Sequence, residues 1–160
     1  MILMLYGPSC CGKTTLMKML AEYKYTPVPT GNLTRSLYAI GCTNMPVIMQ
    51  TVIQHMQPGN YCFDHFYIHT MEQLHDLTGE WPVVVGVLDK RTSPTRHSQD
   101  PVKIQRKQER FNAQAPEIAE WLRTHPVKFV SVINTDYGFD LSELIEHCII
   151  PYNALVMKRP

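Results

Sequence analysis

The sequence predicts an α/β fold in which helices cover both faces of a parallel sheet. Short apolar segments alternate with segments of helical periodicity along the whole chain, and turn residues such as Pro58-Gly59 separate them. The apolar segments are typical of buried strands, which parallel sheets contain. With 160 residues and no internal repeat or low-complexity segment, the chain is expected to form a single domain over 1–160.

The composition is that of a soluble globular protein, with 44% hydrophobic and 18% charged residues. A formal net charge of +1 neither demands nor excludes an acidic partner. We find no signal peptide and no apolar stretch long enough for a membrane span. The five cysteines are odd in number and lack metal-ligand spacing, which favours free thiols in a reducing compartment. We therefore expect a cytoplasmic protein with no membrane partner, and leave its oligomeric state open.

The first fifteen residues carry the most specific signal. An apolar segment at 1–6 precedes Gly7–Thr14 (GPSCCGKT), which fits the phosphate-binding pattern G-x-x-x-x-G-K-[ST], and 15–22 has helical spacing. A strand, a glycine loop and a helix in this order favour a true motif over a chance match. Backbone N–H groups and the helix N-terminus would hold phosphate there. The predicted nucleotide-binding residues are Gly7, Pro8, Ser9, Cys10, Cys11, Gly12, Lys13, Thr14 and Thr15.

Four side chains of this loop have predicted individual roles. Lys13 is expected to reach the β- and γ-phosphates of ATP, and the Thr14 hydroxyl to ligate Mg²⁺. The helix N-terminus is expected to lower the pKa of the Cys10 and Cys11 thiols, which would face the bound nucleotide.

The remaining elements alternate as the fold class requires. Strands are predicted at 24–29, 61–63, 83–88 and 128–133, and helices at 33–38 with Asn32 as a cap, at 47–56, at 67–77, from 101 to 123 with a break near Pro116, and at 141–150. Residues 134–140 are predicted to be a loop.

Two predicted strands end in an aspartate, Asp64 and Asp89. Sites in open parallel sheets lie at the carboxyl ends of strands, so both side chains can face the phosphate loop. Either carboxylate can hold Mg²⁺ together with Thr14, and one can accept the proton of an attacking hydroxyl. The alternative is that each aspartate caps the segment that follows it.

The segment 90–110 is strongly basic. It contains Lys90, Arg91, Arg96, Lys103, Arg106, Lys107 and Arg110 against two acidic residues. One interpretation is a solvated helix face. The other is a lid whose arginines, Arg91 and Arg96, close on the triphosphate and neutralise charge during transfer.

This order of phosphate loop, Phe63-Asp64-His65 and basic segment resembles the P-loop nucleoside and nucleotide kinases, including thymidylate, deoxynucleoside and polynucleotide kinases. The resemblance covers nearly the whole chain as architecture, but only the loop is specific as sequence. It implies a three-layer P-loop fold with a five-stranded parallel sheet in the order 2-3-1-4-5, a lid at roughly 90–110, and ATP and Mg²⁺ as cofactors.

The resemblance also implies roles for individual residues. Asp64 matches the acid of the family's Asp-Arg motif, but His65 stands where those kinases carry arginine. Arg35 lies in the region that grips the acceptor in relatives. Asn134 falls in the segment that corresponds to the donor-base loop, although a polar turn after a strand needs no function.

The function predicted from these features is transfer of the γ-phosphate of ATP to a nucleoside or nucleoside monophosphate, with a deoxynucleotide favoured. The first alternative is a kinase acting on DNA, at a 5′-hydroxyl end or a hydroxylated modified base. The near-zero net charge and the scattered aromatic residues favour the small nucleotide. A nucleotide-binding module without catalysis is the second alternative, because His65 breaks the family pattern. A GTPase switch is disfavoured because no N-K-x-D motif follows.

Overall fold

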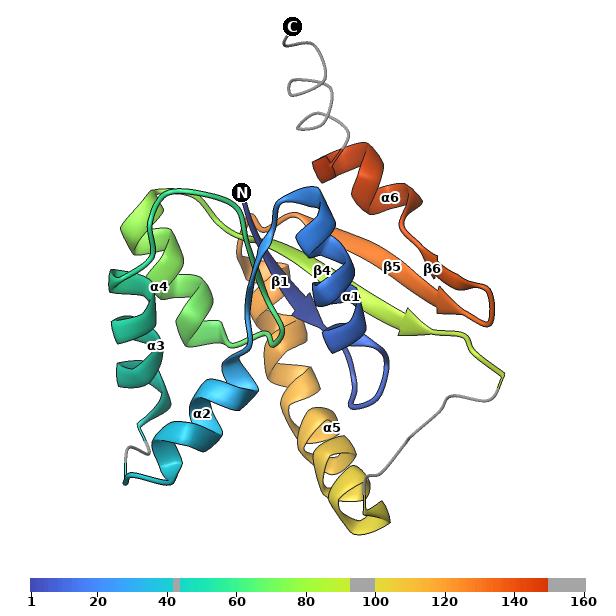
Figure 1. The fold of residues 1–160 in the computed structure, drawn as a ribbon, viewed down its shortest axis with the longest axis horizontal. Coiled ribbons are helices and arrows are strands. Elements are labelled where there is room, and N and C mark those ends of the chain that lie inside the picture. Colours follow the sequence, from blue (N-terminus) through green and yellow to red (C-terminus); the bar gives the residue numbers. More distant parts are fainter. Residues whose placement is uncertain (42–43, 93–99, 150–160) are drawn as a thin grey trace, which may run out of the picture.

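The computed structural model describes residues 1–41, 44–92 and 100–149, which build a six-stranded sheet (Figure 1). The strands are β1 (Ile2–Tyr6), β2 (Thr26–Val28), β3 (Tyr61–Phe63), β4 (Val83–Asp89), β5 (Phe129–Thr135) and β6 (Gly138–Asp140), in the order β2-β3-β1-β4-β5-β6. Neighbouring strands run parallel except β5 and β6, which are antiparallel. The prediction of a five-stranded parallel sheet was therefore incomplete, because a sixth strand extends it beyond β5.

Helices cover both faces of this sheet. They are α1 (Lys13–Leu20), α2 (Thr30–Tyr38), α3 (Met45–Gln54), α4 (Ile68–Thr78), α5 (Pro101–Thr124) and α6 (Ser142–Leu144), with a 3₁₀ turn at Ala21–Tyr23 and a π-helical turn at Ile145–Ile149. In Figure 1, α1 lies in front of the strands and α5 behind them.

The alternation of side chains along β1 divides the core into two halves. Leu3 and Leu5 join the cluster that contains Leu16 of α1 and Leu144 of α6, whereas Met4 joins the cluster on the opposite face. That second cluster takes its helical members from α3, α4 and α5. Because successive residues of a strand point to opposite faces, the continuous apolar sequence of β1 is buried on both sides. The predicted three-layer arrangement is present.

The segment 134–140, which we predicted to be a loop, is a β-hairpin. Asn134 and Thr135 complete β5, and β6 pairs with them after a short turn. Thr135 Oγ1 donates to the carbonyl of Gly138 at 2.8 Å and accepts from the N–H of Tyr137 at 3.2 Å. Gly138 has a φ of 115°, a value that favours glycine. The loop prediction was wrong because the segment is polar and lacks the apolar alternation by which a strand is recognised in sequence.

The predicted break at Pro116 is also absent, since α5 runs without interruption from Pro101 to Thr124. A proline inside a helix removes a hydrogen bond and costs about 3 kcal/mol. The next turn buries Ile118 and Trp121 against the sheet, and this packing offsets the cost. The predicted closing helix at 141–150 is a short α6 followed by the π-helical turn.

The helix predicted to begin at residue 33, with Asn32 as its cap, begins three residues earlier, at Thr30. Its first N–H donates to Asp64 Oδ1 at 2.9 Å, so the cap is supplied by a side chain 34 positions along the chain. Local sequence reasoning does not detect a cap of this kind.

Cys10, Cys11, Cys62 and Cys148 carry free thiols, as the sequence predicts, and Cys42 lies outside the described residues. Within 1–41, 44–92 and 100–149, no helix has the combined length and apolar character needed to cross a bilayer.

Two leucines of α4 provide a matched test of this packing. Leu74 is completely buried in the core, whereas Leu77 is 58% exposed. We expect Leu74→Ala to lower the free energy of unfolding by about 2–5 kcal/mol, and Leu77→Ala to change it by less than about 0.5 kcal/mol. Urea denaturation of both variants measures the difference. Equal losses would contradict the assignment of the α4 face that packs on the sheet.

Candidate active site

The phosphate-binding loop joins β1 to α1 through two left-handed backbone conformations. Cys10 has a φ of 66° and Gly12 a φ of 104°. A Cβ on Gly12 would lie 2.7 Å from Asn134 Nδ2. A Cβ on Gly7 would lie 3.0 Å from the carbonyl oxygen of Val87 on β4. Both glycines of the motif are therefore needed because neighbouring strands approach the loop closely.

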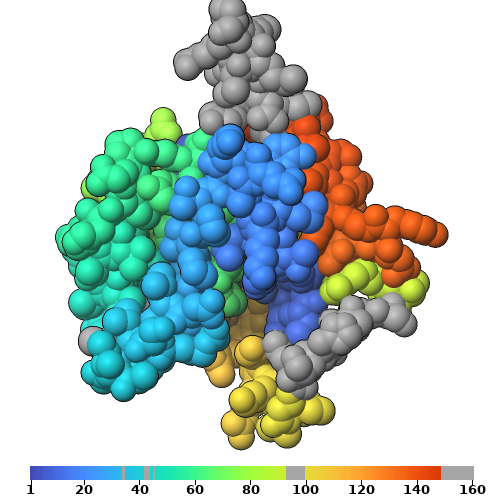
Figure 2. All heavy atoms as spheres, in the orientation of Figure 1, coloured from blue at the N-terminus to red at the C-terminus, as the bar shows by residue number. Residues whose placement is uncertain are grey.

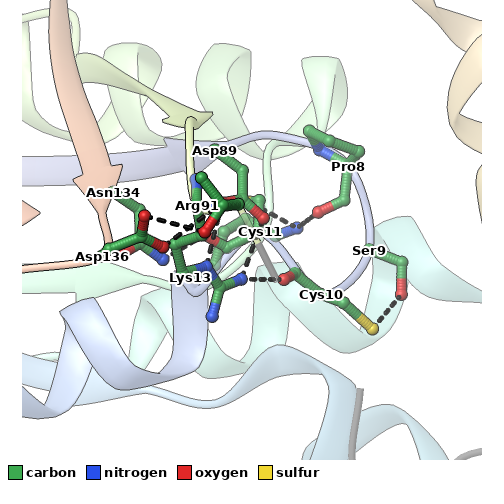
Figure 3. Close-up of polar contacts among 10 residues, drawn as sticks. Pro8, Ser9, Cys10, Cys11, Lys13, Asp89, Arg91, Asn134 and Asp136 are labelled. Carbon is green, nitrogen blue, oxygen red and sulfur yellow. Dashed lines mark hydrogen bonds and ion pairs between the residues drawn. The ribbon is translucent and has the colours of Figure 1, made fainter. Parts of the chain in front are cut away.

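Lys13 is the first residue of α1 and its side chain folds back under the loop (Figure 3). Its Nζ donates to the carbonyls of Gly7 at 2.6 Å and Pro8 at 2.8 Å, and the residue is 8% exposed. Burial lowers the pKa of Lys13, while Cys11 and Asp64 act in the opposite direction. The structure therefore holds a lysine beside the helix N-terminus, at the place where a triphosphate would bind.

Two further side chains hold carbonyls of the same loop. Arg91 Nη2 donates to the carbonyl of Cys10 at 2.7 Å, and Asn134 Nδ2 donates to the carbonyl of Cys11 at 3.0 Å (Figure 3). In a trans peptide the C=O and the following N–H point in opposite directions. Holding the Cys11 carbonyl against Asn134 therefore turns the N–H of Gly12 the other way. This is the orientation that an anion-binding backbone nest requires.

Asn134 has a structural role that the sequence did not reveal. It lies on β5 and is 5% exposed. Its hydrogen bond to the Cys11 carbonyl supports the loop from the β5 side. Its own carbonyl accepts from the N–H of Lys90 at 2.8 Å. A contact between Asn134 and the base of ATP stays a prediction, whereas the brace beneath the loop is observed.

Asp89 and Arg91 form a two-pronged ion pair beside the loop. Arg91 Nε donates to Asp89 Oδ1 and Nη2 to Asp89 Oδ2, both at 2.9 Å, and each side chain is 19% exposed. The hydrogen bonding to Asp89 raises the pKa of Arg91. Both oxygens of Asp89 are thus engaged, so metal binding by this carboxylate would require the pair to open. Arg96, the other predicted lid arginine, lies outside the described residues.

The chain after β4 is fastened to the β5–β6 hairpin by a contact that sequence reasoning missed. The N–H and Oγ1 of Thr92 donate to the two carboxylate oxygens of Asp136, both at 2.9 Å. This contact and the Asp89–Arg91 pair fix the start of the basic segment 90–110 next to the phosphate loop.

Asp64 lies at the end of β3 and also anchors α2. Its Oδ1 accepts from the N–H of Thr30 at 2.9 Å and from Thr30 Oγ1 at 2.5 Å. The Asp64 charge opposes the lowering of the Lys13 pKa by burial. The sequence offered Asp64 as a cap of the segment that follows it, but the helix it caps is α2, which precedes it in the chain. A contact between Asp64 and Mg²⁺ or an acceptor stays a prediction.

His65 follows Asp64 directly in the chain, and Arg35 lies on α2, the helix that Asp64 caps. The pKa of His65 is lowered, first because surrounding protein withdraws part of the ring from water, and then because Lys13, Lys107 and Arg35 contribute positive charge. Asp64 opposes this shift. A neutral imidazole is the form favoured by these surroundings. Arg35 is exposed on α2 and hydrogen-bonds to Asn32.

The Cys11 thiol does not have the environment that the sequence predicted. Its side chain is 1% exposed, and Sγ lies 2.8 Å from the position a Gly7 Cβ would occupy, beneath the loop. Burial raises the pKa of Cys11, although Lys13 opposes the shift. The prediction of a lowered pKa was wrong for Cys11, because burial outweighs the helix N-terminus. Cys10 is half-buried, and its Sγ lies 3.6 Å from Ser9 Oγ.

The residues predicted to hold Mg²⁺ supply oxygen ligands of the kind this ion prefers. Thr14 is exposed in the first turn of α1, and Asp64 is half-buried directly after β3. In the described part of the chain, no three His, Cys, Asp or Glu side chains form a metal-binding group. Magnesium at phosphate sites takes few protein ligands and keeps water and phosphate oxygens. The donor set therefore suits an ion that arrives with a nucleotide.

No protein-family model matches this sequence, and no curated protein matches it in a sequence search. Solved structures do match. A gluconokinase from Sinorhizobium meliloti 1021 superposes with a TM-score of 0.55 at 11% identity, covering 96% of this chain and 91% of that one. The YorR protein of Bacillus subtilis, in complex with phosphorylated GDP, has a TM-score of 0.51 at 14% identity and covers 100% of both chains.

A proposed kinase from Chloroflexus aurantiacus J-10-fl has a TM-score of 0.52 at 14% identity, covering 91% of this chain and 94% of that one. At these identities the likeness concerns the fold. The chain shares its α/β fold with these structures, two of which are described as kinases.

The brace formed by Asn134 yields a test of loop geometry. We expect Asn134→Ala to weaken ATP binding about tenfold, because a buried hydrogen bond worth roughly 1–1.5 kcal/mol would no longer hold the Cys11 carbonyl. Asn112→Ala, at an exposed position of α5, is the control. Calorimetric titration with ATP and Mg²⁺ compares them. Unchanged affinity in Asn134→Ala would show that Lys13 and Arg91 suffice to shape the loop.

Proposed function

We propose that this protein is an ATP-dependent phosphotransferase whose acceptor binds between α2 and the phosphate loop. The observation that carries the proposal is the placement of Asp64 directly after β3, because β3 pairs with β1, the strand that leads into the loop with Lys13. One group suits the donor phosphates and the other an attacking hydroxyl. A transfer site needs both on the same edge of the sheet.

The chemistry follows from these two groups. An oxygen of the acceptor forms a bond to the γ-phosphorus, the bond from that phosphorus to the β–γ bridging oxygen breaks, and its electron pair leaves with ADP. The proton of the acceptor hydroxyl passes to the Asp64 carboxylate and then to water. Lys13 offsets negative charge on the β- and γ-phosphates. The Thr14 hydroxyl would hold Mg²⁺ supplied with ATP, and the ion would offset negative charge on the phosphates.

A nucleotide unit is the acceptor that these surroundings favour. Arg35 provides a positive charge on α2, and Tyr67 lies beside His65 with a ring separation of 5.8 Å. An aromatic ring and a cation near the reacting end suit a base and a phosphate. The phosphorylated GDP bound to the YorR protein is in keeping with this proposal.

The simplest acceptor is a free nucleoside or nucleoside monophosphate, as the sequence predicts. The second candidate is a nucleotide at the end of a polynucleotide, and the charge distribution on α5 favours it, as argued below. In either case Asp64 and Lys13 have the same roles.

Replacing Lys13 tests the donor half of the site. We expect Lys13→Ala to reduce kcat by a factor of at least about 10²–10³, because no other cation of the loop reaches the γ-phosphate. Lys18→Ala is the control, since Lys18 is exposed in the last turn of the same helix. Turnover of Lys13→Ala within tenfold of the unmodified protein would contradict the proposed role of the loop.

Two substitutions separate the chemical role of Asp64 from its role in capping α2. Asp64→Asn is expected to retain ATP binding and to lose at least about 10²-fold in turnover, because the amide cannot accept the proton. Thr30→Val removes the hydroxyl that bonds to Asp64 Oδ1 and keeps the carboxylate, so it should lose far less activity. Similar losses in both variants, with equal drops in melting temperature, would mean that Asp64 acts only through the helix.

A further inference from the structure

The first half of α5 carries a row of cations on one side. Lys103, Arg106, Lys107 and Arg110 are all exposed, and at 100° per residue they lie within a sector of about 100° around the helix axis. We call these four residues the α5 basic stripe. Glu109 lies outside this sector, about 60° from Arg106 around the axis, and accepts a hydrogen bond from Gln105.

The stripe lies next to the site described above. Phe111 of α5 packs against Tyr6, the residue before Gly7, with ring centroids 5.3 Å apart. This contact brings the first half of α5 alongside the start of the phosphate loop. Lys107 and Arg110 lie in the turn directly before Phe111, so they are the stripe residues nearest to this contact along the helix. Figure 2 shows a hollow between α2 and the first half of α5.

The charge pattern of the stripe disfavours the helix that carries it. Lys103 occupies the first turn, where the helix N-terminus is itself positive, and the acidic residue beside that turn is the N-cap Asp100, whose side chain bonds to the N–H of Val102. Lys103–Lys107 and Arg106–Arg110 are like-charged pairs four residues apart, each destabilising by about 0.2–0.5 kcal/mol. In the described part of the chain none of the four cations forms an ion pair. Folding stability therefore does not account for the stripe, whereas a bound polyanion does.

The length of the stripe indicates more than one phosphate. From residue 103 to residue 110 the helix rises about 10 Å, at about 1.5 Å per residue. Successive phosphates of one nucleic-acid strand are spaced about 3.4 Å apart along a duplex axis, so this distance corresponds to about three phosphates. A free monophosphate would contact only the end of the stripe near Phe111. Tyr38, 48% exposed on α2, offers a ring for a base on the opposite wall.

We propose that the acceptor is the terminal nucleotide of a single-stranded polynucleotide whose backbone phosphates lie along the α5 basic stripe. The inference rests on the proposed phosphoryl transfer and assigns its substrate class. The terminal hydroxyl oxygen bonds to the γ-phosphorus of ATP, ADP leaves with the bridging oxygen, and the hydroxyl proton passes to Asp64. The overall net charge of +1 conceals this surface, because the four cations are concentrated on one helix.

The test measures acceptor KM at saturating Mg·ATP and two salt concentrations that differ fourfold. The acceptors are a nucleoside, its 5′-monophosphate, and fifteen-nucleotide DNA and RNA single strands with 5′-hydroxyl ends. With three phosphates neutralised on a single strand, the KM of the oligonucleotide should rise roughly 20-fold between the two salts. The KM of the monophosphate should rise only a few-fold. Use of DNA, RNA or both supports the proposal, and the two arms show whether the sugar matters.

Variants identify the surface responsible. Lys103→Ala with Arg106→Ala removes the two cations farthest from Phe111, and should raise the oligonucleotide KM and flatten its salt dependence far more than the monophosphate KM. Arg123→Ala is the matched control, because Arg123 lies on the same helix outside the stripe and pairs with Glu120. Circular dichroism verifies that α5 remains helical in both.

Three outcomes would overturn the inference while the proposed function stands: efficient transfer to the free monophosphate with no preference for oligonucleotides, a salt dependence unaffected by the double substitution, or a preference for duplex over single strands. Binding of ATP without transfer to any acceptor would instead contradict the proposed function itself.

Discussion

The phosphate loop depends on hydrogen bonds that hold its carbonyl groups away from the ligand side. Lys13 binds the carbonyls of Gly7 and Pro8 from within, and Asn134 binds that of Cys11 from β5. Carbonyl oxygens left facing a triphosphate would repel it, so these contacts are a condition for anion binding. Lys13 bonds to loop carbonyls in the present structure and would bond to phosphate oxygens in the proposed complex. Its buried ammonium group would therefore be hydrogen-bonded in both states.

The sheet brings the other groups to this loop from distant parts of the chain. Asp64 follows β3 and Asp89 ends β4, the two strands that flank β1. The two carboxylates have different partners: Asp89 pairs with Arg91, whereas one oxygen of Asp64 caps α2. This asymmetry is the structural basis for assigning the acceptor side to Asp64 and the donor side to Arg91. The basic half of α5 lies across a hollow from α2 (Figure 2), which links substrate class to chemistry.

Much of this could be predicted from sequence because the relevant signals are local. The apolar segment 1–6 and the pattern Gly7–Thr14 each occupy one uninterrupted stretch of sequence. The buried strand at 83–88 is likewise encoded by consecutive apolar residues. Features set by long-range contacts could not be found in this way. The cap of α2 comes from Asp64, and the partner of the Cys11 carbonyl is Asn134, on β5. Sequence reasoning also predicted a helix break at Pro116, but packing of the following turn keeps α5 continuous. Likewise, the pKa of Cys11 is set by the burial of its side chain and not by its position in the motif.

The central claim is that the site transfers phosphate and does not merely bind nucleotide. Mass spectrometry of acceptors incubated with Mg²⁺ and ATP carrying ¹⁸O in its γ-phosphate tests this most directly. The account predicts that the acceptor gains one phosphoryl group bearing the label, with ADP formed in equal amount. Label recovered only in intact ATP or in inorganic phosphate, across nucleosides, monophosphates and oligonucleotides, would contradict it.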